Sequence, residues 1–329
     1  MNISPDGYTT VCGNPENPDT WLYIRNDNGI YVRGVEIDSG KGGEEVKILQ
    51  FTDVHFNYVN EKDFDNEEVM GTIRHRFWNA GGASVIAVKK VMEYAKNFDQ
   101  TVVTGDVLDY LTHGAMELME KYIWDKDPEI MISLGSHDLT RQMQTGIKDK
   151  TSLESRYKII ENFWRHDVYY TSKILKDKVM IIQLDNNQHH YRDCQVSKLE
   201  ADLEIARKNG YVVLIFQHDP LCTGYPEDAV KKALWAGEGA GDTRNYYDEA
   251  VGYNPEDEAT KKIYGMLTGN ADIIKGFFCG HRHGCYYMEV KGSYTDENGN
   301  VIEKNIPQYV LEAVVYDDYA GHVTEITIK

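Results

Sequence analysis

The segment 46–55 constrains this chain most, because a short apolar run ends there in an aspartate and a histidine two residues apart. The run is suited to a buried strand. Since side chains i and i+2 of a strand point to the same side, Asp53 and His55 are expected to face one point past the strand's carboxyl end. Open α/β sheets bind ligands at that end. A carboxylate with an imidazole suits zinc, manganese or iron, so the pair indicates a metal site wherever other segments supply partners.

The overall charge argues against a broad nucleic-acid-binding face. The 329 residues include 35 Lys and Arg against 53 Asp and Glu, which gives a net charge of −18. An acidic surface repels phosphate backbones, so no extended nucleic-acid surface is expected, although bound metal ions reverse the sign inside a cleft. A chain of this length can form one large domain or two small ones around a well-buried core.

Cysteine usage and the apolar segments indicate a cytoplasmic protein. The five cysteines are odd in number and are never spaced as C-x-x-C, so a reducing compartment is expected rather than a disulfide framework. The first residues lack the basic start and apolar stretch of a signal peptide. No apolar segment approaches the ~18–20 residues that a membrane-spanning helix needs. A cytoplasmic location without a membrane segment is therefore expected.

Residues 1–44 are expected to form an irregular segment and a β-hairpin packed on the main domain, which comprises residues 45–329. β-Prone runs at 21–25 and 30–35 flank an Asn-Asp-Asn-Gly turn, and Asn-Gly between such runs is a strong hairpin signal. A separate binding module is the alternative, but the segment is short for one.

Strands and helices alternate through the rest of the chain. Apolar residues at helical spacing predict helices, and short apolar runs predict strands. Their alternation is typical of βαβ units and indicates the α/β class. The expected helices are 83–97, 113–125, 151–164, 195–209, 226–235 and 256–268. The expected strands after the first are 100–106, 130–134, 168–171, 179–185, 211–216, 273–279, 286–290, 309–315 and 322–328, with a turn at 296–299.

Five of these strands end in residue types that bind metals. The five ends are Asp53-x-His55, Gly105-Asp106, Gly135-Ser136-His137-Asp138, His218 and Gly280-His281-x-His283. Each has an ordinary explanation when taken alone, since an aspartate can cap a helix and a histidine can occupy a turn. Those explanations do not account for the recurrence of the pattern at the ends of the most apolar segments.

The order and residue types of the five strand ends resemble the motifs of the calcineurin-like metallophosphoesterases, which run D-x-H, G-D, G-N-H-[DE], H and G-H-x-H. The resemblance covers residues from about 46 to 285. Two smaller matches are Leu184-Asp185 followed by Gln195-x-x-x-Leu199, and His218-x-Pro220. The resemblance implies a four-layer α/β/β/α sandwich, here with an N-terminal β-hairpin, and a site at the strand ends between the two sheets.

The resemblance also implies a binuclear metal site. It assigns Asp53, His55, Asp106 and His283 to one metal, with Asp106 bridging to a second metal that His218, His281 and the position of Ser136 would bind. The expected cofactors are two transition-metal ions of manganese, iron or zinc. His137 would lie near the leaving group, and Asp138 is a candidate to orient it, with a helix cap as the alternative.

The implied activity is hydrolysis of a phosphoester by a metal-activated hydroxide. A small phosphorylated substrate is expected, and the sequence leaves open whether it is a monoester or a diester. Specificity is expected in the loops 56–80, 139–151, 186–194 and 221–255, because fold resemblance does not supply a substrate.

Ser136 is the one departure from the family pattern at the metal ligands, because the family has Asn there. A Ser hydroxyl is shorter than an Asn carboxamide and is a weaker neutral donor. We therefore expect weaker binding of the second metal, or a water in place of the missing donor. The alternative function is a metal-binding protein on the same scaffold with weak or no catalysis. A third alternative is an unrelated α/β interaction module with scattered histidines.

Overall fold

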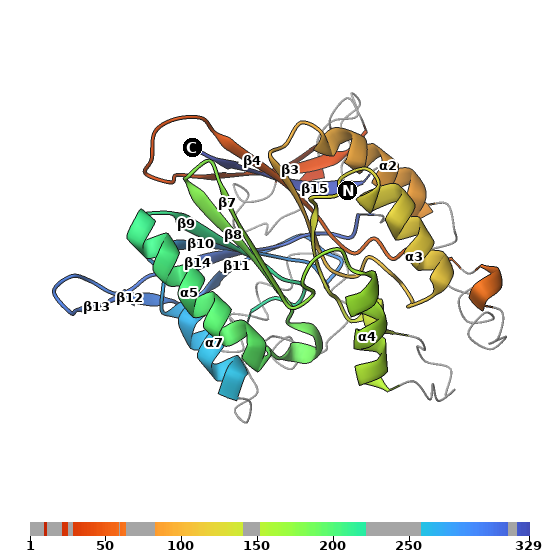
Figure 1. Ribbon diagram of the computed structural model, residues 1–329. Coiled ribbons are helices and arrows are strands. Elements are labelled where there is room, and N and C mark those ends of the chain that lie inside the picture. The colour runs from red at the N-terminus through yellow and green to blue at the C-terminus, as the bar shows by residue number, and fades with distance from the viewer. Residues whose placement is uncertain are drawn as a thin grey trace.

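Figure 1 shows the computed structural model of the chain. The structure describes residues 10–11, 22–25, 29–58, 60–63, 83–140, 152–221, 258–314 and 321–329. These residues form two large sheets, with helices packed beside each sheet. The predicted α/β class is confirmed, while the number of layers stays a prediction. The expected helix at 226–235 and most of the expected loops 56–80 and 221–255 lie outside the described residues.

The first sheet carries three of the five predicted strand ends. Its strand order is β1 (Thr10–Val11), β2 (Leu22–Arg25), β3 (Tyr31–Ile37), β15 (His322–Ile328), β4 (Val46–Phe51), β5 (Gln100–Thr104) and β6 (Met131–Ser133). Strands β4, β5 and β6 are parallel neighbours, so their carboxyl ends meet at one edge of the sheet. The expected N-terminal hairpin is confirmed as β2 and β3. Since β3 also pairs with β15, the hairpin belongs to this sheet, and the division at residue 45 stays a prediction.

The second sheet carries the other two strand ends. Its order is β11 (Tyr286–Val290), β14 (Ile306–Val310), β10 (Ile274–Cys279), β9 (Val212–Phe216), β8 (Val179–Leu184) and β7 (Tyr170–Leu175). Strands β8, β9, β10 and β14 are parallel, while β7 and β11 are antiparallel to their neighbours. Strands β9 and β10 therefore deliver their following residues to the same edge.

The core consists of three groups of buried side chains, because both sheets bury both faces. Successive side chains of β4 point to opposite faces of the sheet, as expected for a strand. Ile48 packs toward the second sheet, and Leu49 packs toward the helices. The helices beside the first sheet are α2 (Ala83–Ala95), α3 (His113–Met119) and α4 (Leu153–Phe163). The helices beside the second sheet are α5 (Asp193–Asn209) and α7 (Glu258–Thr268).

Helix boundaries agree with the sequence expectation to within a few residues. Helix α5 ends where expected, at Gly210, whose φ of 66° is left-handed and therefore favours glycine. The expected helix 113–125 begins as α3 but continues as a π-helical turn over Glu120–Trp124. The helical hydrogen bonds thus shift by one residue there, and periodicity cannot reveal such a shift.

The strand expected at 309–315 is wrong in position. Strand β14 ends at Val310, and the buried apolar residues after it cross between the sheets instead of continuing the strand. The N–H of Leu311 donates to Cys279 O at 3.0 Å beside the second sheet, and the N–H of Val314 donates to Thr52 O at 2.9 Å beside the first. The expected turn at 296–299 connects an additional small hairpin of β12 (Ser293–Thr295) and β13 (Val301–Glu303).

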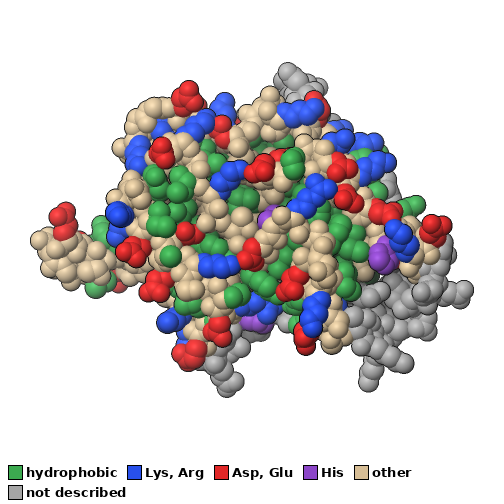
Figure 2. Space-filling view, viewed as in Figure 1, with side chains coloured by type: hydrophobic (Ala, Val, Ile, Leu, Met, Phe, Trp, Pro, Cys, Tyr) green, Lys and Arg blue, Asp and Glu red, His purple; other side chains and the backbone are tan. Residues whose placement is uncertain are grey.

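Acidic and basic side chains are interspersed over the face seen in Figure 2, and no continuous basic area is visible there. Among the helices that the structure describes, none is both long and apolar enough to cross a membrane.

Candidate metal centre

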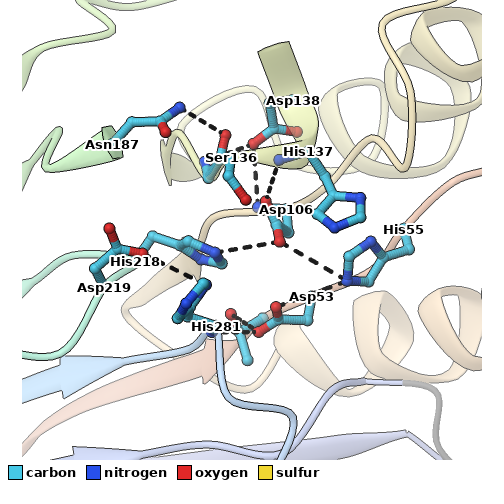
Figure 3. A network of polar contacts seen from close by, with 12 residues as sticks. Asp53, His55, Asp106, Ser136, His137, Asp138, Asn187, His218, Asp219 and His281 are labelled. Carbon is cyan, nitrogen blue, oxygen red and sulfur yellow. Dashed lines mark hydrogen bonds and ion pairs between the residues drawn. The ribbon is translucent and has the colours of Figure 1, made fainter. Parts of the chain in front are cut away.

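The five predicted strand ends come together between the two sheets (Figure 3). Backbone hydrogen bonds join neighbouring ends directly. The N–H of Asp53 donates to Gly105 O at 3.0 Å, and the N–H of Gly280 donates to His218 O at 3.0 Å. Parallel strands thus place loops that are far apart in sequence around one point, as expected at the carboxyl ends of such sheets.

The first metal-binding group contains Asp53, His55, Asp106 and His283. One potential ligand atom from each lies within 4.8 Å of the others. The Nε2 atoms of His55 and His283 are 2.9 Å apart, and His283 Nε2 lies 3.1 Å from Asp53 Oδ1. Two imidazole nitrogens and two carboxylates that converge in this way suit a first-row transition metal.

The second group contains Asp106, His218 and His281, again with ligand atoms within 4.8 Å of one another. His218 Nε2 lies 3.2 Å from Asp106 Oδ2. Asp106 is the residue that the two groups share, so its carboxylate lies where a bridging ligand would.

The donor atoms themselves provide a test of whether these residues fit metal ions. Among the described residues, the buried Asp53 Oδ1 and His218 Nε2 have ionic contacts but no hydrogen bond of normal geometry. Buried polar atoms are rarely left in that condition. A metal at each group would satisfy them, so the residues fit a binuclear site.

The backbone of the predicted ligands is held in an unusual conformation. Eight described non-glycine residues have a positive φ, and five of them are predicted ligands. They are Asp53, His55, Asp106, His281 and His283, with φ between 46° and 73°. Left-handed backbone at ordinary side chains costs of order 1–3 kcal/mol each and clusters at functional sites. The fold therefore maintains this arrangement at an energetic cost.

Glycines beside the ligands allow the close approach of side chains from other strands. A Cβ at Gly105, whose φ is 87°, would overlap the ring of His218, and one at Gly135 would overlap the carboxylate of Asp106. These contacts explain why glycine precedes the metal-type residues in the sequence.

We expect Gly280→Ala to weaken the first metal group. The new Cβ would overlap the Thr52 hydroxyl and the Asp53 carboxylate, so the ligand must move, at a cost of ~1–3 kcal/mol in stability. Calorimetric metal titration and thermal unfolding measure both effects. Gly265→Ala in α7 is the matched control, because a Cβ there meets nothing within 4 Å. Equal metal affinity in both variants would contradict the expectation.

Buried charges at the site stabilise one another in the metal-free chain. Burial alone would raise the pKa of Asp106, but the charges of His218 and His137 hold that pKa well below its usual range. Burial alone would lower the pKa of His55, but its contact with Asp109 and other carboxylates raises that pKa to about 9. Metal binding must therefore displace protons from imidazoles, because only the neutral ring ligates.

Asp109 is a candidate site residue that the sequence interpretation missed. Its fully buried carboxylate lies 3.1 Å from Nδ1 of His137 and 3.4 Å from Nδ1 of His55, and the amide of Asn57 donates to it at 2.9 Å. The contact uses the His55 nitrogen opposite the one that meets His283, so it orients this ligand ring. The signal available in the sequence was a second aspartate three residues after Asp106.

The carboxylate of Asp138 accepts hydrogen bonds from backbone N–H groups and does not contact the His137 ring. The donors are the N–H groups of Asp106 at 3.1 Å, Leu108 at 2.7 Å and Gly135 at 2.8 Å. Burial and the charge of Asp106 raise the pKa of Asp138 to about 7. These contacts fasten the loop after β5 to the loop after β6, whereas the carboxylate beside His137 is that of Asp109.

Ser136 lies beside Asp106 in the turn after β6, and its side chain is exposed (Figure 3). Its carbonyl accepts from the Thr140 hydroxyl at 2.8 Å, and no hydrogen bond of its hydroxyl is seen within the described part of the chain. The neighbouring carbonyl of Gly135 accepts from the Asn187 amide at 2.8 Å. No hydrogen bond within the described residues therefore fixes the Ser136 hydroxyl.

Comparisons with known proteins add the following findings. No family model and no curated protein matches the sequence. The chain is similar in structure to solved phosphatases and phosphoesterases. One is a dimetal phosphatase from Danio rerio, with 14% identity and a TM-score of 0.44, covering 86% of this chain and 91% of that one. Another is a purple acid phosphatase from yellow lupin (Lupinus luteus) seeds, with 11% identity and a TM-score of 0.44, covering 93% of this chain and 48% of that one.

A third similar structure is a calcineurin-like phosphoesterase from Bacillus subtilis. It is 12% identical, with a TM-score of 0.35, and the match covers 82% of this chain and 81% of that one.

Proposed function

We propose that this chain is a metal-dependent phosphoester hydrolase with a binuclear site. The observation that carries the proposal is the pair of ligand groups that share Asp106. A carboxylate common to two histidine-rich groups is the arrangement that holds two metals close together. The order of the motifs along the chain supports the same reaction class.

The bound metals would supply a coordinated water of lowered pKa and Lewis-acid contacts to phosphoryl oxygens. The chain's own residues would do the rest. Asp53, His55, Asp106 and His283 would hold one ion, and Asp106, His218 and His281 the other. Manganese, iron and zinc all suit these oxygen and nitrogen donors.

We infer that His137 acts on the leaving group. Its side chain is 15% exposed, and its ring meets His55 edge-on with centroids 4.6 Å apart. With Asp109 at Nδ1, the other ring nitrogen, Nε2, is left to donate a proton to the departing ester oxygen. The leaving group would then depart as a neutral alcohol.

Hydrolysis of a nitrophenyl phosphate monoester and diester, measured side by side, tests the proposal. The chain is stripped of metal and then reloaded with manganese. Turnover that depends on metal supports the proposal, and the preferred ester separates phosphatase from phosphodiesterase. A chain that binds no transition metal and gains no thermal stability from one would favour an interaction module instead.

A metal-binding scaffold with weak or no turnover is the second candidate, and Ser136 is the observation that favours it. The exposed Ser136 side chain offers the second metal a short, neutral hydroxyl. Metal uptake at both groups with no hydrolysis across a broad panel of phosphoesters would support this candidate over the enzyme.

Ser136→Asn is expected to raise the affinity of the weaker metal site, by about tenfold on the scale seen for groups around metal ligands. The longer carboxamide would bring a carbonyl oxygen toward the second group. Isothermal titration with manganese resolves the two sites, and Ser136→Ala is the matched control. If the weaker site gains nothing over the parent, Ser136 does not limit metal binding.

A further inference from the structure

A second buried carboxylate, that of Asp219, contacts two histidines at the other side of the site. Asp219 Oδ1 lies 3.5 Å from Nδ1 of His281, and Oδ2 lies 3.1 Å from Nδ1 of His189. His281 belongs to the second metal-binding group, whereas His189 belongs to neither of the two groups that share Asp106. Asp219 is 2% exposed, so its charge is not screened by bulk water.

This arrangement repeats the one around Asp109. There, one buried carboxylate contacts Nδ1 of a ligand histidine, His55, at 3.4 Å and Nδ1 of a non-ligand histidine, His137, at 3.1 Å. At Asp219 the corresponding distances are 3.5 Å and 3.1 Å. Asp109 contacts a predicted ligand of the first metal group, and Asp219 contacts one of the second. Each group therefore has beside it a histidine, His137 or His189, that the ligand assignment does not use.

The backbone around Asp219 is held firmly. Its N–H donates to Asn186 Oδ1 at 3.1 Å, and its carbonyl accepts from the side-chain amides of Asn186 at 2.7 Å and Gln217 at 2.8 Å. The backbone that carries this carboxylate is therefore fixed in place.

His189 ends a short 3-10 turn, Asn187–His189, that follows β8. Its φ of 62° is left-handed, as in the five predicted ligands. The ring stands edge-on to that of His281, with centroids 6.3 Å apart. Its Nδ1 is buried at ion-pair distance from Asp219, whereas the side chain as a whole is 39% exposed. The rest of the ring is thus open to an incoming ligand.

We propose that His189 binds a phosphoryl oxygen of the substrate on the side of the second metal group, and that Asp219 positions His189. With Nδ1 of the ring facing Asp219, the other ring nitrogen, Nε2, is the atom that can donate to an anionic oxygen. No bond of the substrate is made or broken by His189. The inference rests on the proposed function, because it concerns the same site and the same phosphoester class.

The inference also gives Asp219 a role toward the second metal. A carboxylate at Nδ1 of His281 fixes the tautomer in which Nε2 carries the lone pair. Asp219 is therefore a positioning residue for two rings, whereas His189 acts on the substrate alone. Variants of the two residues should differ in metal binding for that reason.

Binding of inorganic phosphate to the manganese-loaded chain, measured by calorimetry, tests the inference. His189→Asn keeps a residue type that accepts left-handed backbone but is too short to place a donor where Nε2 lies. We expect its phosphate dissociation constant to rise at least about tenfold, as for loss of a hydrogen bond to a charged group, with both metals still bound. Asp219→Asn should weaken phosphate and, in addition, weaken the second metal about 10–100-fold.

His113→Asn, at an exposed position at the start of α3, is the matched control and should bind phosphate like the parent. Unchanged phosphate affinity in His189→Asn overturns the inference. Loss of metal from His189→Asn in step with phosphate overturns it as well, because His189 would then support the metal site. A loaded parent that binds phosphate yet hydrolyses no ester leaves the inference standing and removes the proposed function, whereas a parent that binds neither metal nor phosphate removes both.

Discussion

Asp106→Asn is expected to remove metal-dependent turnover almost completely, by at least ~10³-fold or about 4 kcal/mol of transition-state stabilisation. The reason is that the two carboxylate oxygens of Asp106 have different partners: one accepts a backbone hydrogen bond, and the other faces the histidines of both metal groups. Oδ1 accepts the backbone N–H of His137 at 2.8 Å. Oδ2 faces Nε2 of His218 at 3.2 Å and Nε2 of His55 at 3.9 Å.

The substitution separates those two roles. If the Asn carbonyl keeps the hydrogen bond of Oδ1, its NH₂ group replaces Oδ2 and points a donor at the place where the metals would bind. The turn that carries His137 keeps its contact, so the fold should survive. Both metal groups lose their shared ligand, so binding should weaken at two sites together.

Metal titration by calorimetry and elemental analysis after dialysis measure this loss, and circular dichroism verifies the fold. Asp125→Asn is the matched control, because its carboxylate is 55% exposed and contacts only Arg165 among the ion pairs of the described residues. A variant at Asp106 that loses one metal and retains the other would show that the carboxylate does not bridge.

The ligand groups could be predicted from the sequence because each one comes from the end of an apolar run. Parallel strands bring such ends together whatever lies between them in the chain. The resemblance of these ends to a known family pattern assigned Asp53, His55, Asp106 and His283 to one metal, and the structure brings their ligand atoms within 4.8 Å.

The carboxylates that orient the histidines could not be predicted in the same way. Asp109 lies in the loop beyond β5, and Asp219 directly follows the predicted ligand His218. Their roles follow from which ring nitrogen they meet. That depends on the rotation of an imidazole and on the path of a loop, neither of which has a periodicity that a sequence can reveal.

The strand expected at 309–315 was misplaced for a related reason. An apolar run signals burial, and Leu311 and Val314 are indeed fully buried. Burial between two sheets does not require strand pairing, since the backbone there bonds to both sheets in turn. Composition therefore predicted the environment of this segment correctly and its conformation incorrectly.

His137→Ala is expected to lower turnover by ~10²–10⁴-fold while both metals stay bound. Its Nδ1 lies 3.1 Å from the buried carboxylate of Asp109, and its ring packs edge-on against His55. A histidine held in this way can donate a proton from its other nitrogen without being a ligand. Removing the ring leaves the ligand set around Asp106 unchanged, so metal content should equal that of the parent.

The size of the loss should depend on the leaving group. Nitrophenolate departs without a proton, whereas an alkoxide needs one, so the alkyl ester should lose the larger factor. Steady-state rates on a nitrophenyl phosphate and on a simple alkyl phosphate measure the difference, and His113→Ala in α3 is the control. Equal losses on both esters would show that His137 binds the phosphoryl group instead of protonating the leaving oxygen, and unchanged turnover would remove it from the mechanism.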